Sequence, residues 1–249
     1  MSTKNKALAT TTQTAVATQQ ATAVIEYGNK SANLAQALAT EMDGLNLTFE
    51  RIKIPAGGGL AYEVPSDNPD SPDMVKDFKA VILYHHPSHS YYKERYTGGN
   101  TPPDCASNDG HTGIVAETGE IRECKDCPNN KFGSGENGAK LCKQKRRVYI
   151  LRAGEALPII FSIPTGSLAD FSKYIGRLLN KGKKSNSVVT NFALKKAQNA
   201  GGITYSQAVL SVDRELNPEE LALIEPFAEQ IRAIAQRLPA STAAADDEE

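Results

Sequence analysis

The sequence has no tryptophan and no long uninterrupted apolar run. A membrane-spanning helix needs roughly 18 or more consecutive apolar residues, so no membrane span is expected. Residues 7–25 carry no charge, but Thr and Gln interrupt every apolar stretch, and the segment therefore lacks the apolar centre of a secretory signal peptide. We expect a cytoplasmic protein, in the host-cell cytoplasm if a phage encodes it.

Several motifs typical of enzymes are also missing from the sequence. It contains no phosphate-binding Walker loop, no G-x-S-x-G nucleophile turn, no H-E-x-x-H zinc motif and no convincing Cys–His nucleophile pair. The run AGGGL at 56–60 lacks the Lys-Ser/Thr pair that a phosphate loop needs, and a turn is the better interpretation. The sequence therefore predicts a protein that is not an enzyme.

Charge is nearly balanced overall but unevenly distributed. The formal net charge is −1, which argues against a surface coated in basic residues. The sequence ends in DDEE at 246–249, whereas basic residues gather in other segments. We expect this acidic tail to dock replication or recombination proteins.

Hydrophobic periodicity predicts a mainly β (α+β) chain. Apolar and polar residues alternate in several short runs separated by Gly- and Pro-containing turns, and two longer stretches have the period of a helix. About six strands with a helix between two of them fit an OB-like antiparallel barrel, and a sandwich covered by helices on one face is the alternative. The predicted parts are a low-complexity, partly helical arm at 1–44, a β-rich core at 45–215 with a zinc-binding insert at 100–145, a C-terminal helix at 216–238 and a disordered acidic tail at 239–249.

All four cysteines fall between residues 105 and 142, in the pattern C-x18-C-x2-C-x14-C. A two-residue spacing such as Cys124–Cys127 lets two thiolates reach one ion from a tight turn, and Cys105 and Cys142 would complete a tetrahedral site. Disulfides do not suit a protein without an export signal, a redox Cys-x-x-Cys needs no further thiols, and iron–sulfur clusters use tighter spacings. We therefore predict one structural Zn²⁺ ion, which supplies the folding free energy of a loop with little apolar content.

Basic and aromatic residues gather in three segments. Residues 143–152 (KQKRRVYILR) carry no acid, residues 85–96 combine tyrosines with basic side chains, and a third basic cluster follows the first predicted helix. Aromatic faces stack on unpaired bases and cations neutralise phosphates, although charged strand edges and solvated helix faces give the same patterns. The predicted nucleic-acid contacts are Arg51, Lys53, Tyr91, Tyr92, Lys93, Arg95, Tyr96, Lys143, Lys145, Arg146, Arg147, Lys173, Tyr174, Arg177, Lys181, Lys183 and Lys184.

Three segments resemble known proteins. RIKIPAGGGLAYEVP (51–65), PPDCASNDGHTG (102–113) and CKDCPNNKFGSG (124–135) cover about half of the core and resemble poorly characterised zinc-ribbon proteins of phages and integrative mobile elements. More loosely, the layout is similar to the zinc-containing single-stranded DNA-binding proteins of T-even phages, which insert a metal subdomain into an OB-fold and end in an acidic tail. That family uses one His with three Cys at other spacings, so the comparison implies an architecture and assigns no individual residue.

Two functions of different kinds remain open from the sequence. The first is non-sequence-specific binding of single-stranded DNA, with RNA as an alternative, in phage or mobile-element replication or recombination and with self-association along the strand. The second is a zinc-ribbon adaptor that docks on a replication, transcription or assembly partner. Salt-sensitive binding to an oligonucleotide distinguishes them, because phosphate contacts release counterions.

Overall fold

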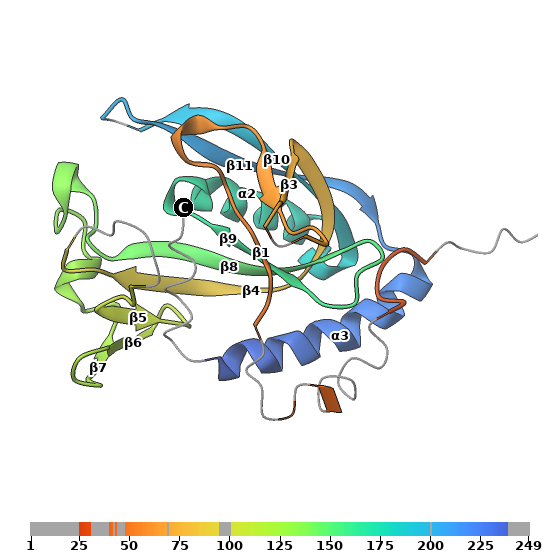
Figure 1. Ribbon diagram of the computed structural model, residues 1–249, viewed down its shortest axis with the longest axis horizontal. Helices are drawn as coiled ribbons and strands as arrows, with labels where there is room; N and C mark the ends of the chain where they lie inside the picture. Colours follow the sequence, from red (N-terminus) through yellow and green to blue (C-terminus); the bar gives the residue numbers. More distant parts are fainter. Residues whose placement is uncertain are drawn as a thin grey trace, which may run out of the picture.

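The computed structural model describes residues 25–30, 40–41, 43, 48–68, 70–94, 101–199 and 201–238 (Figure 1). The acidic tail lies outside these residues, as does most of the predicted partly helical arm. Within them the chain is mainly β with two α-helices, which confirms the predicted α+β class. No helix in this part of the chain is long and apolar enough to cross a bilayer.

Most of the strands belong to one sheet, in the order β1-β9-β8-β4-β5-β6-β7 with β10 beside β4 and β11 beside β10. The long strand β4 pairs with β8 along one edge; on its other edge it pairs with β10 near its start and with β5 near its end. A separate ribbon contains β2 and β3. The strands are β1 (Arg51–Ile52), β2 (Tyr62–Val64), β3 (Asp73–Val75), β4 (Asp77–Tyr91), β5 (Cys105–Ser107), β6 (Thr112–Val115), β7 (Ile121–Glu123), β8 (Lys143–Arg152), β9 (Ile159–Ile163), β10 (Val188–Gln198) and β11 (Thr204–Glu215).

The sheet is buried on both faces. Alternate residues of a strand point to opposite faces, so Ala80 and Ile82 of β4 join a cluster with helix α2 (Leu168–Asn180), whereas Val81 and Leu83 join a second cluster with helix α3 (Pro218–Arg237). Figure 1 shows the two helices on opposite sides of the sheet. Strand β4 therefore has a continuous apolar run at 80–83, where all four residues are buried, whereas Lys79 is exposed.

The two helices begin differently. Asn217 and Glu220 form a reciprocal capping box at the start of α3, which continues through Pro226 without being divided. No side-chain cap begins α2: the Ser167 hydroxyl makes no capping hydrogen bond and instead accepts one from the Ala208 backbone N–H of β11 at 2.9 Å. Single-turn 3-10 helices occur at η1 (Ala56–Gly58), η2 (Pro128–Asn130), η3 (Glu136–Gly138), η4 (Thr165–Ser167) and η5 (Ser185–Ser187).

The described strands do not close into a barrel through backbone pairing. The sheet edges formed by β1 and β11 approach each other through the turn that follows β1. The Ser206 hydroxyl of β11 lies 2.7 Å from the carbonyl oxygen of Pro55 and 2.8 Å from that of Gly59. Gly58 has a φ of 81°, and a Cβ there would lie 2.6 Å from a methyl carbon of Thr204. This close approach, available only to glycine, joins the two edges.

Candidate metal centre and adjoining groove

The predicted zinc insert leaves the end of β4 and returns to the chain at the start of β8. Its described part contains the antiparallel strands β5, β6 and β7, which extend the main sheet at one end (Figure 1). Cys105 begins β5, Cys124 follows β7, Cys127 precedes η2, and Cys142 precedes β8. The insert was expected to be a loop, and its three strands were missed because each has only three or four residues.

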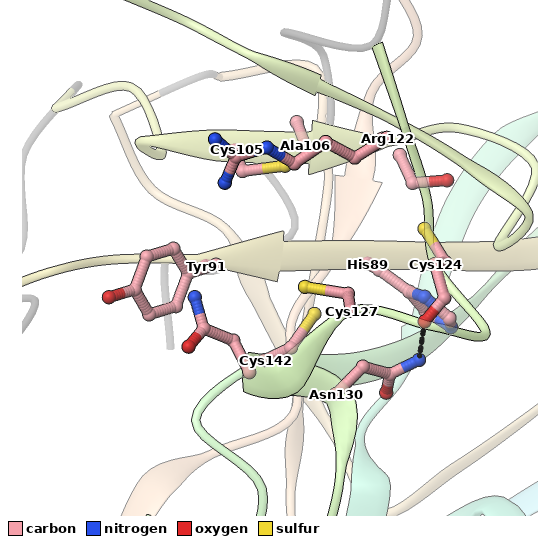
Figure 2. Close-up of a pocket in the computed structure, with 12 residues that line it drawn as sticks. His89, Tyr91, Cys105, Ala106, Arg122, Cys124, Cys127, Asn130 and Cys142 are labelled. Atoms are coloured by element: carbon pink, nitrogen blue, oxygen red, sulfur yellow. Dashed lines mark hydrogen bonds between the residues drawn. The ribbon is translucent and has the colours of Figure 1, made fainter. Parts of the chain in front are cut away.

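All four cysteines line one small cavity of about 30 Å³, and none forms a disulfide. Figure 2 shows their sulfurs around the same space, with Cys105 and Cys124 on one side and Cys127 and Cys142 on the other. The sequence prediction that these residues come together is therefore consistent with the structure. The first and last of the four cysteines are 37 positions apart in the sequence, and the insert brings them to the same cavity.

Gly113 of β6 leaves room for these sulfurs. A Cβ at this position would lie 3.1 Å from the Cys105 sulfur and 3.6 Å from the Cys124 sulfur. The first distance is shorter than ordinary van der Waals contact, so a larger residue would push that thiol out of place. On the side formed by β6, the cavity therefore has room for the sulfur atoms because Gly113 has no side chain.

The thiols are held in a setting that disfavours free thiolates. Burial, together with the neighbouring sulfurs of Cys124, Cys127 and Cys105, raises the pKa of Cys142 to about 12. Burial is also the main reason why the pKa values of Cys105 and Cys124 are raised. Several thiolates in one cavity repel each other, and a divalent cation would remove this repulsion because its charge deprotonates the thiols that bind it. The donor set and its electrostatics therefore fit a soft, thiolate-binding cation such as Zn²⁺.

A bound zinc ion would fix the spacing of the four sulfurs. Among the described residues, no three or more His, Cys, Asp or Glu side chains form a metal-ligating group. Zinc bound by four thiolates at about 2.3 Å would hold the sulfurs about 3.8 Å apart.

Hydrogen bonds tie the cavity wall to the main sheet. The Asn130 side chain donates to the Cys124 carbonyl oxygen at 2.7 Å and accepts from Gln144 Nε2 at 2.8 Å. The Cys142 N–H donates to the Asn129 carbonyl oxygen at 2.8 Å. Because Gln144 belongs to β8, the position of the cysteine loop and the position of the first residues of β8 are coupled.

A groove of about 700 Å³ lies beside the insert, between the start of β8, the turn after β9 and the start of β11. Its described lining contains two cations, Lys143 and Lys145, and no Asp or Glu. Ala139 of the insert forms part of one wall, and Ile203 and Tyr205 of the β10–β11 hairpin form part of another. Figure 1 shows the insert and the tip of this hairpin at the same end of the sheet.

Four of the predicted nucleic-acid contacts lie in or next to this region. Lys143 is exposed and Lys145 is buried in the groove wall. The Lys143 ammonium lies 5.6 Å from the centre of the Tyr92 ring, within the range of a cation–π interaction. Tyr91 instead lines the thiol cavity. The structure therefore brings together the groove lysines and Tyr92.

Three other predicted contacts point away from the groove and into the protein. Arg147 is fully buried and donates to Asn108 Oδ1 at 2.9 Å. Arg146 Nε donates to Nδ1 of His85 at 2.8 Å, and burial lowers the pKa of that histidine to about 4, so the ring stays neutral and can accept. Tyr174 is also buried, in the cluster under α2. All three side chains have structural partners; Arg147 and Tyr174 are buried, and Arg146 is half-buried.

The remaining predicted contacts are dispersed over the surface. Lys93 forms ion pairs with Asp104 and Glu117 of the insert. The described lining of the groove includes no residue of the basic cluster on α2 and after it. Arg95 and Tyr96 lie outside the described residues. In the described part, Arg51 is half-buried, Lys183 pairs with Glu215, Lys173 pairs with Asp170, and Lys53, Arg177, Lys181 and Lys184 are exposed.

Sequence reasoning missed Tyr205, Ile203 and Asn199, which line the groove from the β10–β11 hairpin. Tyr205 is the second residue of β11, and its neighbours carry no basic cluster that would have marked it. Only the Gly201–Gly202 pair marked this segment, as a turn. Comparison of the chain with protein-family models, with curated proteins and with solved structures finds no match.

Proposed function

We propose that this protein binds single-stranded DNA without sequence specificity, as a non-enzymatic component of DNA replication or recombination. One structural zinc ion, bound by Cys105, Cys124, Cys127 and Cys142, would order the insert beside the binding groove. The observation that carries the proposal is the groove itself, which has two lysines and an aromatic ring in its described lining and no acid. Phosphates and unpaired bases require this combination of cations and aromatic faces.

The order of the strands supports an OB-like, partly open barrel. Strands β4, β8 and β9 are consecutive neighbours in the sheet, α2 follows, and β10 then returns to the free edge of β4 before β11 pairs beside it. Such a return of a later strand to the first is a Greek-key connection. OB-folds are five-stranded, partly open Greek-key barrels, and their oligonucleotide sites use the face of strands 2 and 3 and the loops that join strands 1 to 2 and 4 to 5.

The groove occupies the matching place in this chain. With β4 as the first strand, the zinc insert is the loop between strands 1 and 2, and the turn at 199–203 is the loop between strands 4 and 5. Both contribute to the groove, through Ala139 and through Asn199 with Ile203. The start of β8 and the end of β9 contribute Lys143 and Pro164, respectively. The position of the groove therefore follows from the same connectivity that suggests the fold.

The test is fluorescence anisotropy of a labelled dT oligonucleotide at several salt concentrations. Each phosphate neutralised on a single strand contributes about −0.7 to the slope of log K against log salt. We expect salt-dependent binding, and Lys143→Gln should reduce the slope by about 0.7 in magnitude. Lys184→Gln, which removes an exposed charge beyond α2, is the matched control and should leave the slope unchanged. Absence of binding at low salt, or equal affinity for a duplex of the same length, would contradict the proposal.

A second candidate is docking of a protein partner on the insert. The insert has little apolar content, yet two of its large apolar side chains are exposed: Phe132 is 83% exposed and Ile121 is 70% exposed. Exposed apolar side chains that cluster on one module are typical of interaction sites. A stoichiometric partner recovered after nuclease treatment, and lost with Phe132→Ser, would favour this function over strand binding.

A further inference from the structure

Tyr205 is held in the groove by a contact that only glycine permits. Its side chain is half-buried and lines the groove. A Cβ on Gly166 would lie 2.7 Å from Cε2 of the Tyr205 ring and 3.2 Å from both Cδ2 and Cζ. The two flanking atoms are only 0.5 Å farther from that point than Cε2 is, whereas an approach within the ring plane would leave them farther away, so the point lies over a face of the ring rather than at its edge. The backbone of Gly166 therefore covers part of one ring face, and both residues line the groove.

The turn beneath the ring is fixed to the strand that carries it. The carbonyl oxygen of Gly166 accepts a hydrogen bond from Gln207 Nε2 at 2.8 Å. The Ser167 hydroxyl accepts one from the Ala208 N–H at 2.9 Å. These two contacts bind η4 to β11 immediately after Tyr205, so the ring and its support form one rigid unit. A preorganised ring loses little conformational freedom when a ligand stacks on it.

We infer that Tyr205 is a stacking platform for one unpaired nucleobase, and that Gly166 sets its position. This inference rests on the proposed function and names the side chain that would recognise the base. Stacking on a tyrosine face does not depend on the identity of the base, because every base has a π-face. A paired base inside a duplex has both faces covered by its neighbours, so the same platform selects single strands. Lys143, in the same groove lining, supplies a cation for the adjoining phosphate.

The size of the effect follows from general stacking energies. Alanine substitution of a base-stacking aromatic residue weakens binding by about 5- to 150-fold. Tyr205→Ala should fall in this range and leave the salt slope unchanged, because no charge is removed. Tyr205→Phe keeps the ring and should bind like the original protein. A role confined to packing would instead change stability without changing affinity.

Gly166→Ala tests the position of the ring without removing it. The added Cβ must displace the Tyr205 ring, so we expect weaker binding by the same mechanism. Gly176→Ala is the matched control: Gly176 is exposed in α2, and a Cβ there has no atom within 4 Å. Zinc content and thermal unfolding of all variants show whether each is folded. Equal affinity of a folded Gly166→Ala variant and the original protein would overturn the assignment of Gly166.

A direct readout uses the absence of tryptophan from the sequence. Tyr205→Trp places a single indole in the groove, and stacking of a base should quench its emission as oligonucleotide is added. The original protein is measured first by anisotropy, which tests the proposed function independently. If it binds the strand but Tyr205→Ala binds equally well and the indole emission of Tyr205→Trp is not quenched, the platform is refuted while strand binding stands. If the original protein does not bind, the proposed function itself fails.

Discussion

Removing the metal should unfold the insert at residues 101–142 and leave the rest of the fold in place. Among the described residues of the insert, Ala106 and Cys124 are the buried apolar side chains. Burial of one alanine side chain contributes about 1 kcal/mol or less, which does not exceed the roughly 1–2 kcal/mol needed to order a single backbone residue. The two clusters that stabilise the core lie on the main sheet, outside the insert. Metal–thiolate bonds are therefore expected to supply most of the folding free energy of this segment.

Hydrogen exchange measures this effect residue by residue. Free zinc at 100 times its Kd stabilises the bound form by about 2.7 kcal/mol, or about 100-fold in the local opening equilibrium. Exchange of the Cys124 N–H, which donates to the His111 carbonyl oxygen at 2.7 Å, should accelerate by about that factor on chelation. The amides of Phe192 and Leu210, in the β10–β11 pair of the core, are the internal control.

Limited proteolysis gives a second view of the same prediction. The insert contains trypsin sites at Arg122, Lys125, Lys131 and Lys140, and chelation should expose them to rapid cleavage. Cys127→Ser in the presence of zinc should behave like the chelated protein. Unchanged exchange and unchanged cleavage after complete removal of metal would refute the reasoning, since the insert would then be folded by its own contacts.

Three further substitutions test separate parts of the structure. Gly113→Ala places a Cβ 3.1 Å from the Cys105 sulfur, and competition with a chromophoric chelator should show weaker zinc affinity although all four cysteines are kept. Glu220→Ala leaves Arg214 without the fully buried carboxylate that it contacts at 2.7 Å, and urea unfolding should show a loss of about 3 kcal/mol. Despite the opposing effect of burial, hydrogen bonds from Arg214 lower the pKa of Glu220, so its contribution should be present at neutral pH and be lost as the pH falls through that lowered value. Tyr174→Phe removes a buried hydroxyl that lies 2.6 Å from the Thr190 hydroxyl. We expect the free energy of unfolding in urea to fall by about 1–2 kcal/mol and the oligonucleotide affinity to stay unchanged. Weakened binding with unchanged stability would instead make Tyr174 a contact residue.

The local patterns of the sequence were sufficient for most of the elements. Alternating runs separated by Gly- and Pro-containing turns were predicted as strands, and the runs on either side of two such turns form the antiparallel pairs β8–β9 and β10–β11. The apolar period and the Asn217–Pro218 start predicted α3. These features succeed because turn residues and periodicity act over a few neighbouring positions. Short strands such as β5 lack enough residues to show a period, and they form only because β4 supplies a pairing edge.

The sequence by itself also predicted that the four cysteines come together, because a two-residue spacing and two further thiols in a polar loop are typical of one metal site. The tertiary structure alone decided which charged and aromatic side chains are exposed and which are buried. Arg147 and Tyr174 looked like contacts in a basic run and a basic helix, yet both are buried, since the sheet is covered on both faces. Tyr205 and Gly166 meet across 39 positions of sequence, through the return of β10 to the edge of β4. No local sequence pattern predicts this contact, because it depends on the order of the strands and on the space that Gly166 leaves by having no Cβ.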